Sequence, residues 1–199
     1  MFTYYMPTQV FFGKGCIAES GQVLADLGKR ALLVTGRHSA KVNGSQDAFT
    51  GKLDELGISW YLFDDVENNP SIDTIRRAAA FAKEKGVDFV VGIGGGSPMD
   101  AAKAIALLCT DDLDDEQLFK GPYKKPLPIV AVPTTAGTGS EVTKVSVLTN
   151  VHAGTKQSIN TPLIFPVYAF ADPSFTESVS QTVTIDTAID ALRDRKSVV

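Results

Sequence analysis

Residues 89–108 constrain the fold of this chain more than any other stretch. An apolar run ends in three consecutive glycines, Gly94, Gly95 and Gly96, and an alanine-rich segment follows directly. A continuous apolar run that ends in glycine is typical of a strand buried on both faces, whereas the alanine-rich segment favours a helix. The stretch therefore predicts a strand, a turn of bare backbone and a helix in immediate succession.

The same alternation extends along most of the chain. Apolar runs predict strands at residues 8–13, 30–36, 58–64, 88–94, 128–135 and 165–172. Apolar residues at helical spacing predict helices at residues 16–27, 46–56, 71–86 and 97–108. Strands that alternate with helices of this length predict an α/β fold with a doubly wound, mostly parallel sheet of the Rossmann type.

The pattern changes after residue 140. Residues 141–150 and 154–160 alternate polar and apolar side chains around His152-Ala153-Gly154, which predicts an antiparallel hairpin. The last segment predicts a helix that begins near Thr184 and stops after little more than about ten residues.

The glycine turn has the features of an anion site. Ser97 suits the N-cap of the following helix, Pro98 its first helical position, and Asp100 the closing position of a capping box. Such a start presents backbone N–H groups to a phosphate with no side chain in the way. The alternative is a tight strand-to-helix turn without a ligand, since Ser97 stands where the G-x-G-x-x-G pattern has its third glycine.

A second glycine-rich stretch, PTTAGTGSEVT at residues 133–143, follows the next predicted strand. It leaves the same carboxyl edge of a parallel sheet, where ligands of open α/β sheets bind. Its hydroxyl groups suit phosphate, ribose or amide partners; they belong to Thr134, Thr135, Thr138 and Ser140. The alternative is a polar loop whose hydroxyls satisfy its own backbone.

Together, GGGSPMDAAKAIA and PTTAGTGSEVT resemble the signatures of the iron-containing (group III) alcohol dehydrogenases. The resemblance also covers VFFGKG, ENNPSIDT and the strand that ends in Ala171-Asp172-Pro173. It implies a dinucleotide-binding domain over residues 1–180, with residues 181–199 as the remaining start of a helical metal-binding domain. The implied reaction is hydride transfer between a small alcohol or aldehyde and a nicotinamide cofactor.

The resemblance also implies a set of cofactor-binding residues. It places Gly95, Gly96, Ser97 and Asp100 at the pyrophosphate, and Thr135, Thr138 and Ser140 in the second loop along the nicotinamide side. Gly94 and Thr134 adjoin these positions and complete the predicted set. Lys156 matches a lysine near the cofactor ribose, with an ordinary solvated charge as the alternative.

Charge at the end of the second predicted strand favours NADP over NAD. Members of the family that prefer NAD often have an aspartate there, which accepts from the ribose 2′-hydroxyl and repels a 2′-phosphate. This chain has Gly36, followed by Arg37. Gly36 has a second interpretation, compatible with the first, as a turn residue with positive φ.

The resemblance is weakest for the metal, iron or zinc, which the family binds through one aspartate and three histidines. The aspartate matches Asp190, Asp194 stands at the position of the first histidine, and neither His38 nor His152 lies where it could substitute. Asp190 and Asp194 are one helical turn apart and could hold Mg²⁺ or Ca²⁺ weakly, or be two solvated charges. We predict no complete metal site and weak or absent catalysis by this chain alone. A non-enzymatic nucleotide-binding or interaction protein is the alternative.

Composition excludes several classes of partner. The 19 basic and 23 acidic residues give a net charge of -4 and form no basic stripe, so we expect neither nucleic acid nor a membrane surface as a partner. Two cysteines, Cys16 and Cys109, stand far apart in apolar surroundings, which is typical of reduced thiols in a cytoplasmic protein. We also expect a homodimer or higher oligomer with residues 3–12 at the interface, a monomer being the alternative.

Overall fold

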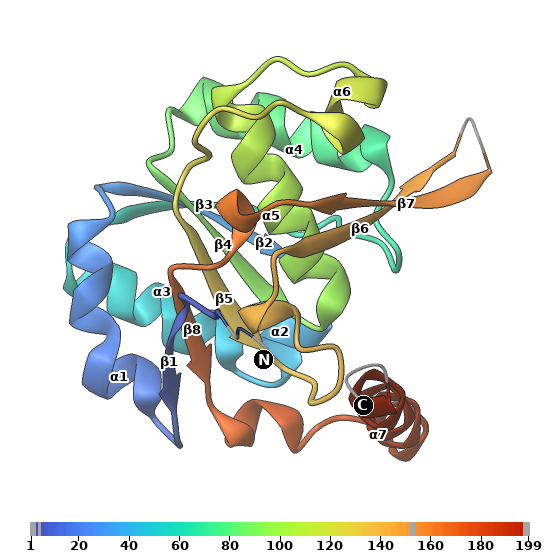
Figure 1. Cartoon of the computed structure of the whole chain (residues 1–199). Helices are drawn as coiled ribbons and strands as arrows, with labels where there is room; N and C mark the ends of the chain where they lie inside the picture. The colour runs from blue at the N-terminus through green and yellow to red at the C-terminus, as the bar shows by residue number, and fades with distance from the viewer. Residues whose placement is uncertain (1–2, 4, 152–153, 197–199) are drawn as a thin grey trace.

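The computed structural model describes residues 3, 5–151 and 154–196, and a six-stranded parallel sheet lies at its centre (Figure 1). The strands are β1 Gln9–Phe12, β2 Arg30–Thr35, β3 Ser59–Phe63, β4 Phe89–Gly94, β5 Ile129–Pro133 and β8 Tyr168–Ala171. Their order is β1-β8-β5-β4-β2-β3, and every neighbouring pair is parallel. The chain adds strands on one side of β2 and then on the other, which confirms the predicted doubly wound sheet.

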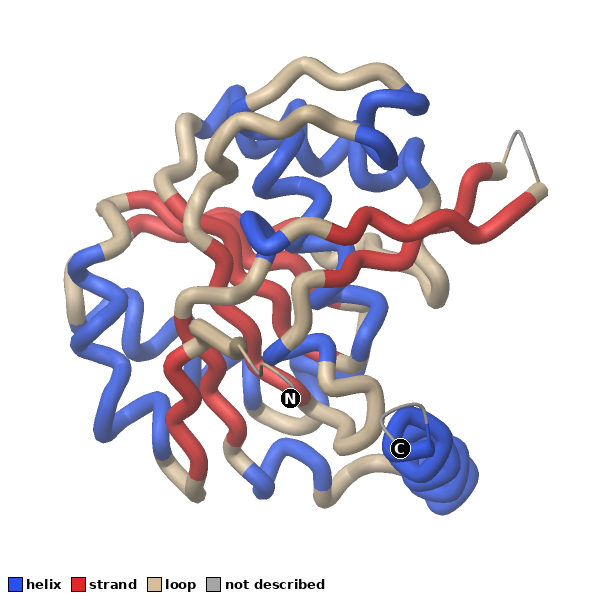
Figure 2. The backbone as a smooth tube through the Cα atoms, viewed as in Figure 1, coloured by secondary structure: helices blue, strands red, loops and turns tan. Residues whose placement is uncertain are grey.

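Helices cover both faces of this sheet (Figure 2). One face carries α1 Cys16–Ser20, α2 Ser39–Val42 and α3 Ser45–Glu55, and the other carries α4 Ile72–Lys85, α5 Gly96–Thr110 and α6 Asp115–Lys120. Within β2, Leu32 belongs to the core beneath α4 and α5, whereas its neighbour Leu33 belongs to the core beneath α1 and α3. Side chains of a strand alternate between faces, so apolar residues at successive positions fill two cores at once.

The predicted helix over residues 16–27 is wrong as a single element. It is α1 followed by a 3-10 helix, η1 Gly21–Asp26. Ser20 and Gly21 lie at the junction, and both have low helix propensity. A Cβ at Gly21 would lie 2.7 Å from Cγ of Lys52 on α3, so the chain packs too closely there for another residue.

Two helices lie outside the sequence prediction. One is the short α2, and the other is α6, where Asp114 and Gln117 form a reciprocal capping box. The last helix, α7 Gln181–Lys196, begins before Thr184 and is longer than predicted. Within the described part of the chain, no helix is long and apolar enough to cross a membrane.

The predicted hairpin is present as β6 Val145–Asn150 and β7 Thr155–Asn160, an antiparallel pair separate from the main sheet. Leu148 and Ile159 are fully buried in the core shared with α5, so the hairpin packs over that helix. In the turn, His152 and Ala153 lie outside the described residues. The connecting 3-10 helices are η2 Ser140–Val142, η3 Pro162–Ile164 and η4 Pro173–Thr176.

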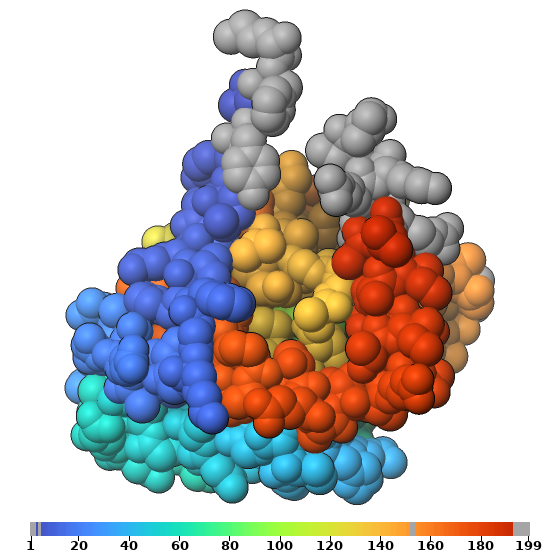
Figure 3. Space-filling model, turned by 90° about the horizontal axis from the view of Figure 1, so that it is seen from below, coloured from blue at the N-terminus to red at the C-terminus, as the bar shows by residue number. Residues whose placement is uncertain are grey.

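Helix α7 lies apart from the two helical layers, beside the loop that follows β5. The two backbones pack closely at Gly137, where a Cβ would lie 2.5 Å from the carbonyl oxygen of Thr187. Seen from below, the N-terminal strand lies on the left and α7 on the right, and the loop after β5 lies between them (Figure 3).

Candidate functional site

The two glycine-rich loops meet at the carboxyl edge of the sheet. Gly94 at the end of β4 is the register partner of Pro133 at the end of β5, and the Thr134 N–H donates to the Gly94 carbonyl at 2.9 Å. A Cβ at Gly95 would lie 3.3 Å from Thr135 Oγ1, so the loops touch and a larger residue requires Thr135 to shift by a few tenths of an ångström. The prediction that both loops share one crevice is confirmed.

The start of α5 differs from the prediction. The N-cap is Gly95 and the first helical residue is Gly96, so Ser97, Pro98 and Asp100 do not form the predicted capping arrangement. The Ser97 hydroxyl instead accepts from the Asn69 N–H at 3.1 Å.

Gly94 explains why the helix begins at Gly96, before the predicted first helical residue Pro98. Its φ is 146°, and a Cβ there would lie 2.8 Å from Pro98 Cγ. A glycine at this position lets the chain leave β4 and enter the helix without a further turn. Among the described residues, no side chain caps the N-terminus of α5, a helix of 15 residues. Its first N–H groups and its positive dipole end therefore suit an anion.

A groove of about 530 Å³ lies on one side of this helix start and is called here the α7-side groove. Gly36 after β2 and the glycine turn after β4 both line it, and Thr35 is level with Ile93 in the sheet. This is the point where the strand order reverses, the usual ligand crevice of a doubly wound sheet. Val183 and Thr187 of α7 form part of its wall.

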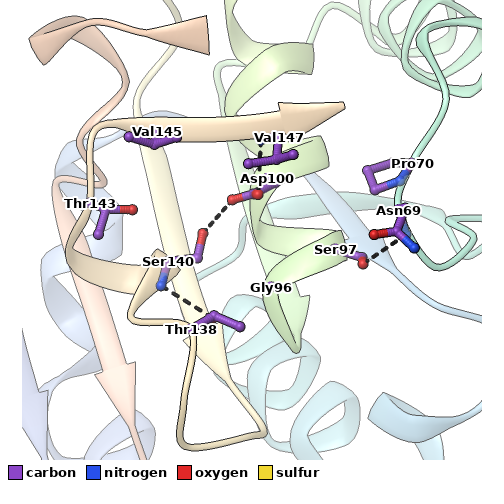
Figure 4. A pocket seen from close by; sticks show the side chains of 10 residues that line it. All are labelled: Asn69, Pro70, Gly96, Ser97, Asp100, Thr138, Ser140, Thr143, Val145 and Val147. Atoms are coloured by element: carbon purple, nitrogen blue, oxygen red, sulfur yellow. Dashed lines mark hydrogen bonds between the residues drawn. The ribbon is translucent and has the colours of Figure 1, made fainter. Parts of the chain in front are cut away.

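A second groove, of about 470 Å³, lies on the other side and is called here the hairpin-side groove (Figure 4). Its lining residues are Asn69, Pro70, Gly96, Ser97, Asp100, Thr138, Ser140, Thr143, Val145 and Val147. Gly96, Ser97 and Thr138 line both grooves. The two grooves therefore meet at the N-terminus of α5, and a long ligand could occupy both.

Hydrogen bonds join α5 to the far wall of the hairpin-side groove. The Ser140 hydroxyl donates to Asp100 Oδ1 at 2.6 Å, and the Val147 N–H donates to Asp100 Oδ2 at 3.0 Å (Figure 4). Behind this wall, the Lys103 ammonium donates to Ser140 Oγ at 2.8 Å. Burial lowers the pKa of Lys103 to about 8, although Asp100 and Glu141 act in the opposite direction.

On the opposite side of this groove, Asn69 forms hydrogen bonds to several other segments. It has a φ of 56°, the single positive value of a non-glycine residue in the described part of the chain. Its carbonyl accepts from the Thr149 hydroxyl at 3.0 Å, and its Oδ1 accepts from the Lys156 ammonium at 2.7 Å. Lys156 is exposed and does not itself line the groove, so its hydrogen bond to Asn69 is its link to the groove wall.

Gly36 and Arg37 have specific surroundings. A Cβ at Gly36 would lie 3.6 Å from the Val66 carbonyl, an ordinary contact, and Gly36 has no positive φ. The interpretation of Gly36 as a positive-φ turn residue is therefore wrong. The Arg37 guanidinium pairs with Asp65 Oδ1 at 2.6 and 2.9 Å, and this hydrogen bond lowers the pKa of Asp65.

The structure describes only some of the residues considered for a metal. Asp190 is exposed on α7, and the described residues contain no group of three or more His, Cys, Asp or Glu side chains that could hold a metal ion. His38 lines the α7-side groove instead. The side chain of Asp194, like His152, lies outside the described residues.

Sequence reasoning missed Lys103 and Asn69. Lys103 is a lone charge in the alanine-rich stretch AAKAIALL, and a lysine on a helix that is otherwise apolar all round is buried with it. Asn69 precedes Pro70, and asparagine is among the few residues that tolerate a left-handed conformation.

The fold and the crevice define a class of protein: doubly wound α/β domains with a ligand-sized groove at the carboxyl edge of the sheet. Residues 7–173 match the family model of the iron-containing alcohol dehydrogenases, and the chain belongs to this family.

Relatives with names and structures agree with this assignment. NADH-dependent butanol dehydrogenase A of Clostridium acetobutylicum is 37% identical over 185 residues, which are 92% of this chain and 48% of that protein. The crystal structure of an iron-containing alcohol dehydrogenase from Thermotoga maritima is 49% identical, with a TM-score of 0.91, over 96% of this chain and 53% of that one.

A third relative is a sulfoacetaldehyde reductase from Bifidobacterium kashiwanohense, solved in complex with NAD⁺. It is 34% identical, with a TM-score of 0.86, over 96% of this chain and 51% of that one. The chain thus spans about half the length of the relatives that it matches.

Proposed function

We propose that this chain is the NAD(P)-binding part of an alcohol dehydrogenase. The observation that carries the proposal is the uncapped N-terminus of α5 at the junction of two grooves. A dinucleotide has this form, with a pyrophosphate between two nucleoside halves. The name of the butanol dehydrogenase and the NAD⁺ complex of the reductase support the same cofactor class.

In this proposal the pyrophosphate lies at the start of α5, against Gly94, Gly95, Gly96 and Ser97. The adenosine half lies in the α7-side groove beside Gly36. The nicotinamide half lies in the hairpin-side groove, where Thr134, Thr135, Thr138 and Ser140 supply hydroxyls, Asp100 fixes the wall and Lys156 approaches from the rim. Residues 1–180 form the cofactor domain, and residues 181–199 begin the next one.

We further propose that NADP is preferred over NAD. Gly36 leaves the rim of the α7-side groove without a carboxylate, and Arg37 adds a cation next to it. Asp65 already pairs with Arg37 and offsets part of its charge. The preference therefore rests mainly on the missing carboxylate at position 36.

The first experiment is a thermal melt of the chain with NADP, NAD and no ligand. A ligand at about 100 times its dissociation constant stabilises the folded state by about 2.7 kcal/mol, which a melting curve resolves readily. We expect a larger rise of the melting temperature with NADP than with NAD. No rise with either ligand at millimolar concentration would contradict cofactor binding and favour an interaction protein derived from the family.

We propose that hydride transfer by this chain alone is weak or absent. The nicotinamide supplies the hydride chemistry when it is bound, and this chain's contribution is to bind and orient it. The described residues do not assemble the metal ligands that the family uses, and Asp190 is exposed. The test follows nicotinamide absorbance with small alcohols and aldehydes, with and without added Fe²⁺ or Zn²⁺. A rate well above buffer would contradict the proposal.

A further inference from the structure

Lys103 is the most deeply buried charge next to the proposed site, with no exposed surface. Its ammonium makes three hydrogen bonds, to Ser140 Oγ at 2.8 Å, Thr143 Oγ1 at 3.2 Å and the Val145 carbonyl at 2.7 Å. A buried ammonium needs its donors satisfied, and these acceptors satisfy all three. The ammonium is also 3.5 Å from Asp100 Oδ1.

All of these partners line the hairpin-side groove, whereas Lys103 itself does not. The ammonium therefore lies directly behind the groove wall and cannot touch a ligand in it. It holds Ser140, Thr143 and Val145 in one arrangement relative to α5. Chains of buried hydrogen bonds of this kind fix a single geometry because each broken bond leaves a desolvated group.

The charge of Lys103 has a second consequence. Asp100 faces the groove with a side chain that is 15% exposed, one turn into the helix whose start we assign to a pyrophosphate. An uncompensated carboxylate there repels a polyanion, and the repulsion is strong because little water screens it. The ammonium at 3.5 Å offsets that charge from behind the wall.

We propose that Lys103 is a positioning residue for the dinucleotide: it fixes the Ser140–Val145 wall of the hairpin-side groove and neutralises Asp100. This inference rests on the proposed cofactor function. It concerns the nicotinamide side of the site, because Lys103 has no partner in the α7-side groove.

The test compares two ligands by calorimetry on the full chain. NADPH would occupy both grooves, whereas adenosine 2′,5′-bisphosphate would occupy only the α7-side groove. We expect Lys103→Met to weaken NADPH about tenfold or more, as an unpaired charge beside a bound anion does, and to weaken the bisphosphate much less. Equal affinities of wild type and variant for NADPH would overturn the proposal, and so would equal losses for both ligands.

A double variant keeps the test decisive if Lys103→Met folds poorly. Lys103→Met with Asp100→Asn removes both charges. The new amide at position 100 suits the wall, because its NH₂ group donates to the Ser140 hydroxyl that Lys103 no longer engages and its oxygen still accepts from the Val147 N–H. We expect this variant to bind NADPH less than about tenfold more weakly than wild type, because the carboxylate is gone although Thr143 Oγ1 and the Val145 carbonyl still lack their donor. A folded double variant that is about tenfold or more weaker would overturn charge neutralisation.

Lys52→Met is the matched control. Lys52 is also a buried lysine, 8% exposed and paired with Glu55 at 2.9 Å, but it lies on α3, on the other face of the sheet. We expect it to change the melting temperature without changing either affinity.

If wild-type protein bound no dinucleotide at all, the proposed function would fail. That outcome is distinct from a failure of the Lys103 proposal, in which wild type binds and the variant binds equally well.

Discussion

Gly36 and Arg37 follow β2 at the rim of the α7-side groove, and the groups around them set the local charge. Arg37 is exposed and shares Asp65 with Arg77 on α4. A side chain at position 36 meets the Val66 carbonyl at an ordinary contact distance. The rim therefore tolerates a new side chain, and its charge can be changed without disturbing the backbone.

Gly36→Asp should reverse the cofactor preference. A carboxylate accepts from the 2′-hydroxyl of NAD and repels the 2′-phosphate of NADP, so we expect NADP to weaken relative to NAD by about tenfold or more, about 1.4 kcal/mol. Calorimetric titration with both cofactors measures the change. Gly51→Asp is the control, because it adds the same charge on α3 where a Cβ meets open space. An unchanged preference would show that the 2′-phosphate lies elsewhere.

From the lowered pKa of Lys103 we expect dinucleotide affinity and folding stability to change with pH in opposite directions. Its pKa is about 8 in the folded chain and ordinarily 10.5, so the unfolded chain holds more protons between these values. The contribution of Lys103 to folding stability therefore rises with pH over that interval. Dinucleotide affinity should fall over the same interval, because the bound anion favours the protonated ammonium.

The measurement is NADPH affinity from about pH 7 to about pH 9.5, in wild type and in Lys103→Met. The charged groups acting on Lys103 are Asp100 on α5 and Glu141 on η2. The cysteines do not titrate in this range, because burial raises the pKa values of Cys16 and Cys109 to about 11. We expect a fall in wild type and a flat profile in the variant. Parallel profiles would assign the titration to another group.

At the scale of elements, the strands were predictable and the helix ends were not. Continuous apolar runs such as residues 89–94 are buried on both faces, so their pattern alone identifies them. The start of α5 depended on Gly94, whose φ of 146° no pattern of polarity reveals. The partners of Ser97, Asp100 and Lys103 come from β6, η2 and Asn69, which are distant in sequence. Those contacts require the tertiary structure.

The turn before α5 gives an element-scale prediction. Gly95 has an ordinary φ of -76°, and a Cβ there lies 3.3 Å from Thr135 Oγ1, so the fold should accept Gly95→Val with a loss of about 1–2 kcal/mol. The added methyl groups should stand in front of the helix N-terminus and block a pyrophosphate. We expect cofactor binding to be lost while circular dichroism is retained. Gly51→Val is the control, and cofactor binding by Gly95→Val would move the anion away from α5.

At the scale of the whole molecule, β1 is an edge strand that, within the described part of the chain, pairs with β8 on one side and with nothing on the other. Val10 is 40% exposed and Phe12 79% exposed, so the edge is apolar as well as unpaired. Edges of this kind pair readily with another chain. We therefore keep the prediction of a homodimer, or a higher oligomer, through residues 3–12.

Replacing Val10 and Phe12 with lysine should separate the copies, because charge on an edge strand opposes strand addition. Light scattering should give at least twice the 21.2 kDa chain mass for wild type at about tens of micromolar and the single-chain mass for the variant. Val42→Lys, at another exposed apolar site, should leave the assembly intact. A wild-type monomer would contradict the prediction, and an intact variant oligomer would move the interface elsewhere.

Helix α7 rests on the loop after β5 at Gly137, and its Val183 and Thr187 form part of the wall of the α7-side groove. A ligand in that groove gains or loses contacts whenever α7 shifts. Occupancy of the groove and the position of α7 are therefore thermodynamically linked, and the linkage is reciprocal. A contact that fixes the position of α7 therefore changes the affinity of the groove for its ligand by some factor. The bound ligand changes the strength of that contact by the same factor.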